Sequence, residues 1–465
     1  VKERLSEYKL QDIVPLVSVN KEPVVKLDGF EVEFIPIAHS IPETSALFIK
    51  TLYGNIMHAT DWRFDDNKLS MVKTDFASLK RAASEGVDIF VCDSTNVMVD
   101  EPQASEEEVR QNLIKIIPEM QGGIVATCFA SNIMRLESLM LAARAAGRTP
   151  VLAGRSLVTN VKIARQCGYL TEYPEIHTID EVEGITSDKA LYICTGSQAN
   201  YRSAMTLIAN DESKHIKLCA EDNVIFSSKI IPGNEDKIER LQEKILAKGV
   251  NLVTEEDYLV HTSGHACKKD LQAMYELLNP KIVLPVHGDK KFIREHKRFA
   301  KSCGVEDVFS AQNGDVCLYQ NGKIEMVEQV PAEVMGVDRG RSVSLGSELI
   351  KNRRRIMYNC TLFISAVISR DYELKSLQFD SIDILEANEW YVLHEEIMQK
   401  VRPLIERRLV EHPHRNAAED YIRGQIRRRV FNATDIKPVT MLQVHWEEDE
   451  DNEGDDKEVY SVTVF

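Results

Sequence analysis

The stretch "HTSGHACKKD", residues 261–270, places two histidines four residues apart around a Ser-Gly pair. A third histidine, His287, follows in "VLPVHGD", residues 283–289. A histidine taken alone is more often a hydrogen-bonded structural residue than a metal ligand or a catalytic group. The role of these three therefore depends on the polar residues that accompany them elsewhere in the chain.

Three further polar clusters follow short apolar segments that are typical of buried strands. They are His39 in "IAHSIPET" (37–44), Asp61 in "HATDWRFD" (58–65) and Asp93 in "CDSTN" (92–96). Layered α/β folds usually place their chemistry at such strand ends. We therefore consider these three residues together with His265 and His287 as one candidate site.

The length and composition indicate a soluble protein of several domains. A chain of 465 residues is too long for one core, so about two to four domains are expected. No apolar run approaches the roughly 18 residues of a membrane span, and the first thirty residues do not resemble a signal peptide. The nine cysteines stand singly, as is typical of free thiols in a reducing compartment. We expect a cytoplasmic protein with no membrane partner.

The net charge of -16 argues at first against a nucleic-acid partner, because phosphate binding depends on Lys and Arg. However, nine carboxylates and one lysine lie in "EEDEDNEGDDKE", residues 447–458. We interpret this run as a solvated loop. The rest of the chain is only mildly acidic, which leaves room for a local basic groove.

The order of predicted elements divides the chain into parts. Strand-like segments fill the first quarter, and from about residue 105 to 255 buried strands alternate with helices, which predicts a parallel sheet covered by helices. After about residue 330, "VDRGRSVSLGS" (337–347) is typical of a polar linker. A strand pair, two amphipathic helices (about 390–411 and 417–432) and a final hairpin then predict a small α/β domain.

The polar motifs occur in an order that resembles a known family. They are "AHSIPET" (38–44), "HATDWRFD" (58–65), "DSTN" (93–96), "FASN" (129–132), "TGSQ" (195–198), "PGNE" (232–235), "HTSGH" (261–265) and "PVHGD" (285–289). This succession resembles the β-CASP branch of the metallo-β-lactamase superfamily, and within it the ribonuclease J family.

The resemblance implies an α/β fold: a metallo-β-lactamase αββα sandwich, an inserted β-CASP parallel-sheet domain and a small C-terminal α/β domain. The metallo-β-lactamase domain would comprise residues 1–100, with its N-terminal part truncated, and the returning segment 255–330. The β-CASP domain would occupy 101–254. A linker would span 331–355, followed by the C-terminal domain at 356–465.

The resemblance also implies a site for two zinc ions. Two zinc ions roughly 4 Å apart can make hydroxide available at neutral pH and stabilise both the attacked and the departing oxygen of a phosphodiester. By similarity His39 would bind one ion, Asp61 would bridge both, and His287 would bind the second.

By the same resemblance, "HTSGH" would contact phosphate. The loop from His261 through Thr262 and Ser263 to Gly264 would offer a hydroxyl and backbone N–H groups. His261 is equally well read as a structural residue. His265 would be catalytic, contacting the scissile phosphate or protonating the leaving oxygen. Asp93 would be a catalytic carboxylate that orients His265 or a metal-binding histidine.

The "FASN" motif lies where a strand meets a helix, and free N–H groups at such a junction favour an anion. In the family this region holds the RNA 5′ end, so Phe129, Ser131 and Asn132 would line a monophosphate pocket. The alternative is that Ser131 or Asn132 only caps the helix.

One motif of the wider superfamily is missing from the printed sequence. H-x-H-x-D-H, which supplies most of the metal ligands, does not occur among the twelve histidines. We expect either a fragment that lacks this segment or a natural pseudo-nuclease, and in both cases an incomplete zinc site and an inactive chain. Smaller departures are Thr60 and Ala38 before the two metal-site residues and "ANY" (199–201) after "TGSQ".

The activity implied by the resemblance is hydrolysis of single-stranded RNA, both 5′-to-3′ from a monophosphate end and endonucleolytic, in RNA processing and decay. The C-terminal domain would support a homo-oligomer, a dimer or a tetramer. The alternative is a non-catalytic RNA-binding or assembly subunit that has lost its metal site. A β-CASP nuclease for DNA or pre-mRNA fits "HSIPE" and "PVHG" less well.

Overall fold

The computed structural model describes residues 1–19, 24–59, 61–65, 73–102, 104–173, 176–182, 185–447 and 460–464. Thr60 and most of the acidic run, residues 448–458, lie outside these ranges. The chain divides into two compact units, residues 10–330 with 1–3 and residues 331–465 with 4–9. Each unit is described below by itself.

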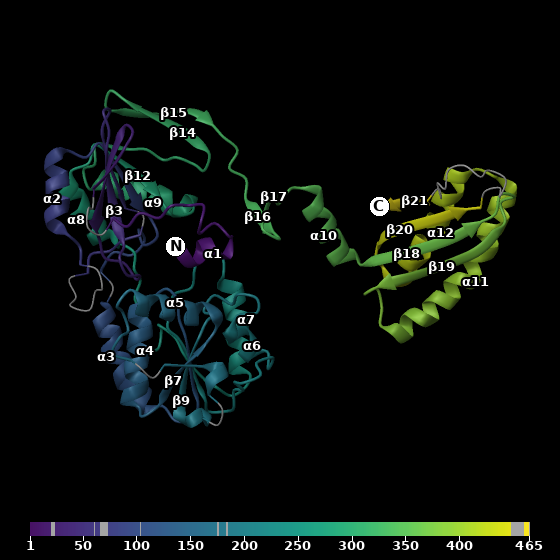
Figure 1. Cartoon of the computed structure of the whole chain (residues 1–465), viewed down its shortest axis with the longest axis horizontal. Coiled ribbons are helices and arrows are strands. Elements are labelled where there is room, and N and C mark those ends of the chain that lie inside the picture. The colour runs from purple at the N-terminus through teal and green to yellow at the C-terminus, as the bar shows by residue number, and fades with distance from the viewer. Residues whose placement is uncertain are drawn as a thin grey trace. The chain divides into compact units, whose positions relative to one another are not determined.

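The first sheet of the larger unit, of which β3 and β12 are labelled in Figure 1, has seven strands in the spatial order β1-β2-β3-β4-β5-β12-β13. Their bounds are β1 Val24–Leu27, β2 Phe30–Pro36, β3 Ser45–Lys50, β4 Asn55–Ala59, β5 Ile89–Asp93, β12 Ile282–Val286 and β13 Asp307–Val308. Strands β1 to β4 are antiparallel neighbours, whereas β4, β5, β12 and β13 run parallel. The sheet is therefore mixed, and the parallel part includes the returning segment of the chain.

Three helices cover the apolar face of this sheet: α2 (Phe76–Glu85), α8 (Lys268–Leu278) and α9 (Lys290–Ser302). Alternate strand residues such as Phe48, Met57 and Phe90 turn toward them and are fully buried, as the two-residue period of a strand requires. The strands β2, β4, β5 and β12 are followed by polar residues on one side of this sheet. The core thus fixes the positions from which the candidate site residues project.

The second sheet is entirely parallel, in the order β11-β10-β6-β9-β7-β8. The strands are β6 Ile124–Thr127, β7 Thr149–Ala153, β8 His177–Thr178, β9 Ala190–Cys194, β10 Asn223–Phe226 and β11 Asn251–Val253. The helices are α3 Glu106–Ile116, α4 Ile133–Ala145, α5 Arg155–Gln166, α6 Ala204–Ala209 and α7 Glu235–Leu246, with 3-10 turns Ile117–Glu119, Ile179–Glu181 and Ser187–Lys189. Ile124 and Ala126 pack with α3 to α5, whereas Val125 packs with α6 and α7. Both faces are covered, which explains why these strands are apolar throughout.

The remaining elements of the larger unit are the antiparallel hairpin of β14 (Asp315–Gln320) and β15 (Lys323–Gln329). A short helix, α1 (Lys2–Glu7), lies near the N-terminus of the chain.

The smaller unit contains a hairpin, β16 (Met335–Asp338) with β17 (Arg341–Ser344), and helix α10 (Glu348–Asn359). Its sheet has the order β19-β18-β20-β21, with β18 Thr361–Ile368, β19 Leu374–Ile382, β20 Val439–Trp446 and β21 Tyr460–Val464. Helices α11 (Ala387–Glu411) and α12 (Arg415–Thr434) pack on this sheet around a separate core.

The predicted fold class is confirmed, since the chain is a mixed α/β protein with parallel sheets. The predicted domain boundaries stay predictions. The range 331–355, expected to be a linker, carries the β16–β17 hairpin and much of α10. Within the described residues, no helix is both long and apolar enough to cross a bilayer.

Candidate active site

The candidate site lies at one edge of the seven-stranded sheet, where β2, β4, β5 and β12 end. These four strands run in the same direction, because β3 is antiparallel to both β2 and β4, and β4, β5 and β12 are parallel. Asp93 is the last residue of β5 and stands opposite Val286, so the next residue, His287, emerges beside it. Asp61 follows β4 by two residues. Strand order and direction therefore bring together residues that lie far apart in the sequence.

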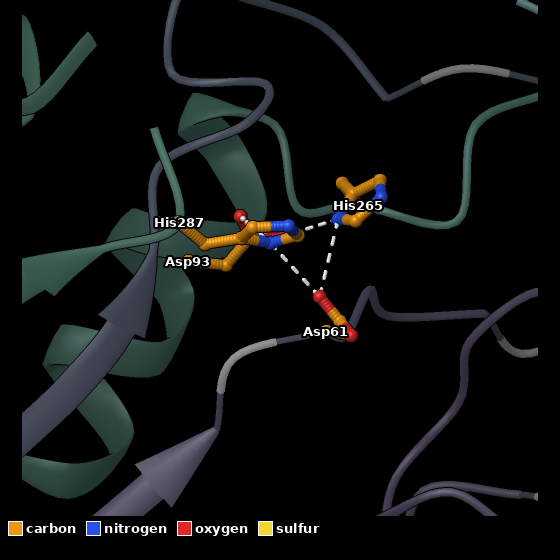
Figure 2. A group of neighbouring side chains, drawn as sticks. All are labelled: Asp61, Asp93, His265 and His287. Atoms are coloured by element: carbon orange, nitrogen blue, oxygen red, sulfur yellow. Dashed lines mark hydrogen bonds and ion pairs between the residues drawn. The ribbon is translucent and has the colours of Figure 1, made fainter. Parts of the chain in front are cut away.

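Four side chains form a compact group at this edge: Asp61, Asp93, His265 and His287 (Figure 2). Each offers one ligand atom, and these atoms all lie within 4.8 Å of one another. In the described part of the chain this is the one group of three or more such residues that could hold a metal ion.

The contacts in this group run between imidazole nitrogens and carboxylate oxygens. His287 Nδ1 lies 2.9 Å from Asp61 Oδ1 and 3.4 Å from Asp93 Oδ1. His265 Nδ1 lies 2.6 Å from Asp93 Oδ2 and 3.9 Å from Asp61 Oδ1. Asp61 Oδ1 is buried, and its contact with His287 is an ion pair whose geometry lies outside that of a hydrogen bond. A buried carboxylate oxygen between two imidazoles, in a set of Asp and His donors, fits a zinc ion.

The electrostatics of the group follow from the two carboxylates. Close contact with the carboxylate of Asp61 and then with that of Asp93 raises the pKa of His287 to about 10. The imidazole of His287 in turn lowers the pKa of Asp61. The pKa of Asp93 is also lowered, because the stabilising contacts with His265, His287 and Thr95 together outweigh the cost of its burial. The two carboxylates thus keep His287 protonated when no metal is bound, and a bound metal ion would replace one of its protons.

Asp93 also anchors the loop that carries it. Its Oδ1 accepts hydrogen bonds from the Thr95 N–H at 2.8 Å and the Thr95 hydroxyl at 2.6 Å, and its side chain is 1% exposed. The contact from His265 Nδ1 to Oδ2 holds that imidazole in one orientation.

The backbone of His287 is in the left-handed region, with φ of 57°. This conformation is uncommon for a residue with a side chain and is found preferentially at functional sites. The next residue, Gly288, packs closely against Ser94, because a Cβ on Gly288 would lie 3.2 Å from the Ser94 Cβ. It would also lie 2.9 Å from the Phe292 Cβ at the start of α9, so glycine is favoured at this position by contacts on both sides.

His39 lies beside this group without being part of it. Its ring centroid is 5.1 Å from that of His265, and its Nδ1 donates to the Gly264 carbonyl at 2.8 Å. The hydrogen bond leaves Nε2 as the nitrogen with a lone pair for a metal. Burial lowers the pKa of His39, so the neutral form that metal binding needs is favoured.

The "HTSGH" loop is held from inside the protein. Thr262 is 2% exposed, and its hydroxyl donates to the Ala104 carbonyl at 2.5 Å and accepts from Arg63 at 3.0 Å. The Ser263 hydroxyl accepts from Asn96 Nδ2 at 3.0 Å and is 6% exposed as a residue. The structure thus turns Thr262 away from the surface, and it supports the loop from behind.

His261 is half-buried beside a cationic side chain. Arg135 Nη1 donates to His261 Nδ1 at 3.3 Å and to the Val260 carbonyl at 2.9 Å. Burial first, and then the charges of Arg135 and Lys229, hold the pKa of His261 well below its usual value. The imidazole of His261 is therefore neutral.

In the "FASN" motif the helix-capping alternative applies to Asn132. Its side chain accepts from the Arg135 N–H at 2.9 Å, at the N-terminus of α4, and donates to Glu106 at 3.1 Å. Ser131 is exposed and Phe129 is half-buried. Of the three residues, Ser131 is the one whose polar group faces solvent.

Two family descriptions match the chain. The family described as "Ribonuclease J, beta-CASP domain" matches residues 121–245, and "Zn-dependent metallo-hydrolase RNA specificity domain" matches residues 249–309. A protein named Ribonuclease J from Sinorhizobium meliloti is 32% identical over 366 residues, which is 78% of this chain and 65% of that protein. The chain belongs to the ribonuclease J family.

Two further members of the ribonuclease J family extend the likeness. The Corynebacterium glutamicum protein is 32% identical over 76% of this chain and 50% of its own length. The Helicobacter pylori B128 protein is 28% identical over 92% of this chain and 63% of its own length. The chain thus spans between half and two thirds of the length of these relatives. A solved structure of a protein of unknown function from Enterococcus faecalis V583 has a TM-score of 0.44 at 15% identity, covering 67% of this chain and 68% of that one.

Several residues at this ribonuclease J site were not predicted from the sequence. Arg63, Asn96, Arg135 and His296 each make hydrogen bonds that hold the site loops. Arg63 lies in "HATDWRFD" and Asn96 in "DSTN", so their place in these motifs is a signal of a role at the site. Arg135 and His296 lie within helices α4 and α9, where the sequence offers no such signal.

Proposed function

We propose that this chain carries the catalytic region of a zinc-dependent ribonuclease that hydrolyses single-stranded RNA, in the 5′-to-3′ direction from a 5′-monophosphate end and also internally. The observation that supports this most is the meeting of Asp61, Asp93, His265 and His287 beside the "HTSGH" loop. Metal-binding and phosphate-binding groups are then neighbours, as phosphodiester hydrolysis requires.

In this proposal Asp61 and His287, with His39 through Nε2, would hold the metal. Zinc, when bound, supplies Lewis acidity that activates water and offsets negative charge on the phosphate. The chain's own residues do the rest. Asp93 holds His265 by its Nδ1, which leaves Nε2 to deliver a proton to the leaving oxygen. The buried "HTSGH" backbone orients the phosphate, and Ser131 contributes to binding of the 5′ end.

The donors present limit how much metal this chain would bind. Zinc takes about four donors, most of them from protein, and Asp61, His287 and His39 cannot satisfy two ions. We therefore propose that the chain alone binds less than stoichiometric zinc at a two-ion site and does not cut RNA. An N-terminal extension carrying H-x-H-x-D-H would supply the remaining ligands.

The test compares the chain with and without such an extension on a 5′-monophosphorylated single-stranded RNA. We expect two zinc ions and RNA degradation only with the extension, and RNA binding that weakens steeply with salt in both proteins. No degradation by the extended protein with two bound zinc ions would contradict the nuclease assignment.

The absence of H-x-H-x-D-H from the printed sequence favours a second candidate, a non-catalytic RNA-binding or assembly subunit. If the protein is such a subunit, we expect it to bind RNA in EDTA, and we expect the extended protein to take up no zinc. The same experiment therefore distinguishes the two functions.

A further inference from the structure

Arg63 lies two residues after Asp61 and turns its side chain into the protein, where it is 10% exposed. Its Nη1 donates to the Ser263 carbonyl at 2.7 Å and to the Thr262 hydroxyl at 3.0 Å. Both Nη atoms also lie 3.4 Å from the Ala104 carbonyl. One guanidinium thus joins the loop after β4 to the "HTSGH" loop and to the start of the second sheet domain.

These contacts belong to a closed ring that includes a candidate metal ligand. The backbone N–H of Arg63 donates to the Ala38 carbonyl at 2.9 Å, next to His39. His39 Nδ1 donates to the Gly264 carbonyl at 2.8 Å, and Arg63 closes the ring at Ser263. The segments of His39, Asp61 and His265 are therefore fixed relative to one another.

The ring also sets the direction of one backbone donor. The Ser263 carbonyl and the Gly264 N–H belong to the same planar peptide and point in opposite directions. Because Arg63 holds that carbonyl, the Gly264 N–H points away from Arg63. It donates to no described residue. A Cβ at Gly264 would lie 2.2 Å from Ser40 Oγ and 2.6 Å from His39 Nδ1, so this close approach to the His39 segment requires glycine.

We propose that Arg63 is a positioning residue for phosphate: it aims the Gly264 N–H at a phosphate oxygen of RNA while Asp61, on the same loop, faces the metal. This inference rests on the proposed function. Arg suits the task because its planar fork can serve three acceptors at once, whereas the lysine ammonium acts as a point charge.

The matched control is Arg110. Its side chain is also 10% exposed, and it forms an ion pair with Glu137 and donates to Ser138 away from the "HTSGH" loop. Arg110→Ala therefore reports the general cost of removing a buried arginine. Arg63→Ala adds to that cost the loss of loop orientation.

The experiment measures binding of a 5′-monophosphorylated single-stranded RNA in EDTA by fluorescence anisotropy, so that no metal or turnover is involved. We expect Arg63→Ala to raise the Kd about tenfold, the size of one lost phosphate hydrogen bond. The Kd of Arg63→Lys should lie between those of the wild type and Arg63→Ala, and the Kd of Arg110→Ala should stay within about twofold of the wild-type value. Circular dichroism shows whether each variant is folded. If Arg63→Ala does not fold, the same binding measurements are made on Arg63→Lys and Arg63→Gln instead.

A second readout follows the Gly264 amide in protein labelled with 15N-glycine, assigned by its loss in Gly264→Ala. Inorganic phosphate should shift this resonance in the wild type and in Arg110→Ala but not in Arg63→Ala. Equal shifts and equal Kd values in the wild type and Arg63→Ala would overturn the proposal, as would equal losses in Arg63→Ala and Arg110→Ala. If the wild type binds no RNA, the proposed function fails, and the response to inorganic phosphate still decides the role of Arg63.

Discussion

At the residue scale, His296 is the buried group that most directly supports the site loop without touching the metal-binding group. It is fully buried, with Nδ1 2.8 Å from the Ser94 hydroxyl and Nε2 2.5 Å from the Tyr275 hydroxyl. Burial lowers its pKa to about 4. The folded protein therefore holds His296 neutral, whereas an unfolded chain protonates it below about pH 6.5.

The sign of the resulting pH dependence follows from linkage. The stability that neutral His296 contributes is fully present above about pH 6.5 and is lost as the pH falls toward 4. We expect His296→Gln to unfold at lower urea than the wild type at pH 7.5, and the difference in unfolding free energy to shrink by about 2 kcal/mol at pH 5. The exposed His215 provides the control substitution, His215→Asn. A difference that does not change with pH would contradict this account.

The candidate site residues could be predicted from sequence to the extent that they follow strands. Asp93 and His287 end or follow adjacent parallel strands, so their meeting is a consequence of strand order. Arg63 could not be predicted as a support, because its role depends on the rotamer that carries its guanidinium to Ser263. The burial of Thr262 was also missed, since a hydroxyl in a polar loop gives no signal of the side it faces.

At the scale of elements, the turn between β12 and α9 joins the site to the core. A Cβ at Gly288 would lie 2.9 Å from the Phe292 Cβ and 3.2 Å from the Ser94 Cβ. We expect Gly288→Ala to displace His287 and to cost about 1–3 kcal/mol of unfolding free energy, as overpacking does. Chemical denaturation at pH 7.5, followed by the unfolding of the larger unit without zinc and again with excess zinc, measures this cost.

Gly424 in α12 provides the opposite case, because a Cβ there meets nothing within 4 Å. Gly424→Ala should stabilise the smaller unit by about 0.5–1 kcal/mol, since alanine loses less backbone freedom in a helix. A loss of stability in Gly424→Ala, or no loss in Gly288→Ala, would show that the space around a Cβ does not decide the effect of alanine at these two positions.

The helices and strands of the second sheet were predicted well because their apolar runs alternate with amphipathic helices. The small C-terminal unit was harder. "MYNCTLFISAVIS" (357–369) was expected to form strands, yet its first three residues end α10 and β18 begins at Thr361. The predicted strand pair was placed within this stretch, whereas the second strand, β19, lies further on at Leu374–Ile382, where the alternation of apolar and polar residues is interrupted.

At the scale of the whole molecule, the smaller unit presents apolar side chains to solvent. Ile382 is 54% exposed, Tyr391 67%, Val392 68% and Val410 75%. Exposed apolar surface of this kind often marks an interface. We expect the full chain to form a homo-oligomer, a dimer or a tetramer, and a chain ending at Val330 to be monomeric by light scattering. Equal oligomeric states for the two proteins would exclude the smaller unit as the interface.

The central claim is that Asp61 and His287 bind metal while His265 acts on phosphate. Equilibrium dialysis with zinc at neutral pH tests it most directly, comparing the wild type with Asp61→Asn, His287→Ala and His265→Ala. We expect less than two equivalents of bound zinc in the wild type, retention of that zinc in His265→Ala, and its loss in Asp61→Asn and His287→Ala. Zinc lost only in His265→Ala, or retained in both Asp61→Asn and His287→Ala, would contradict it.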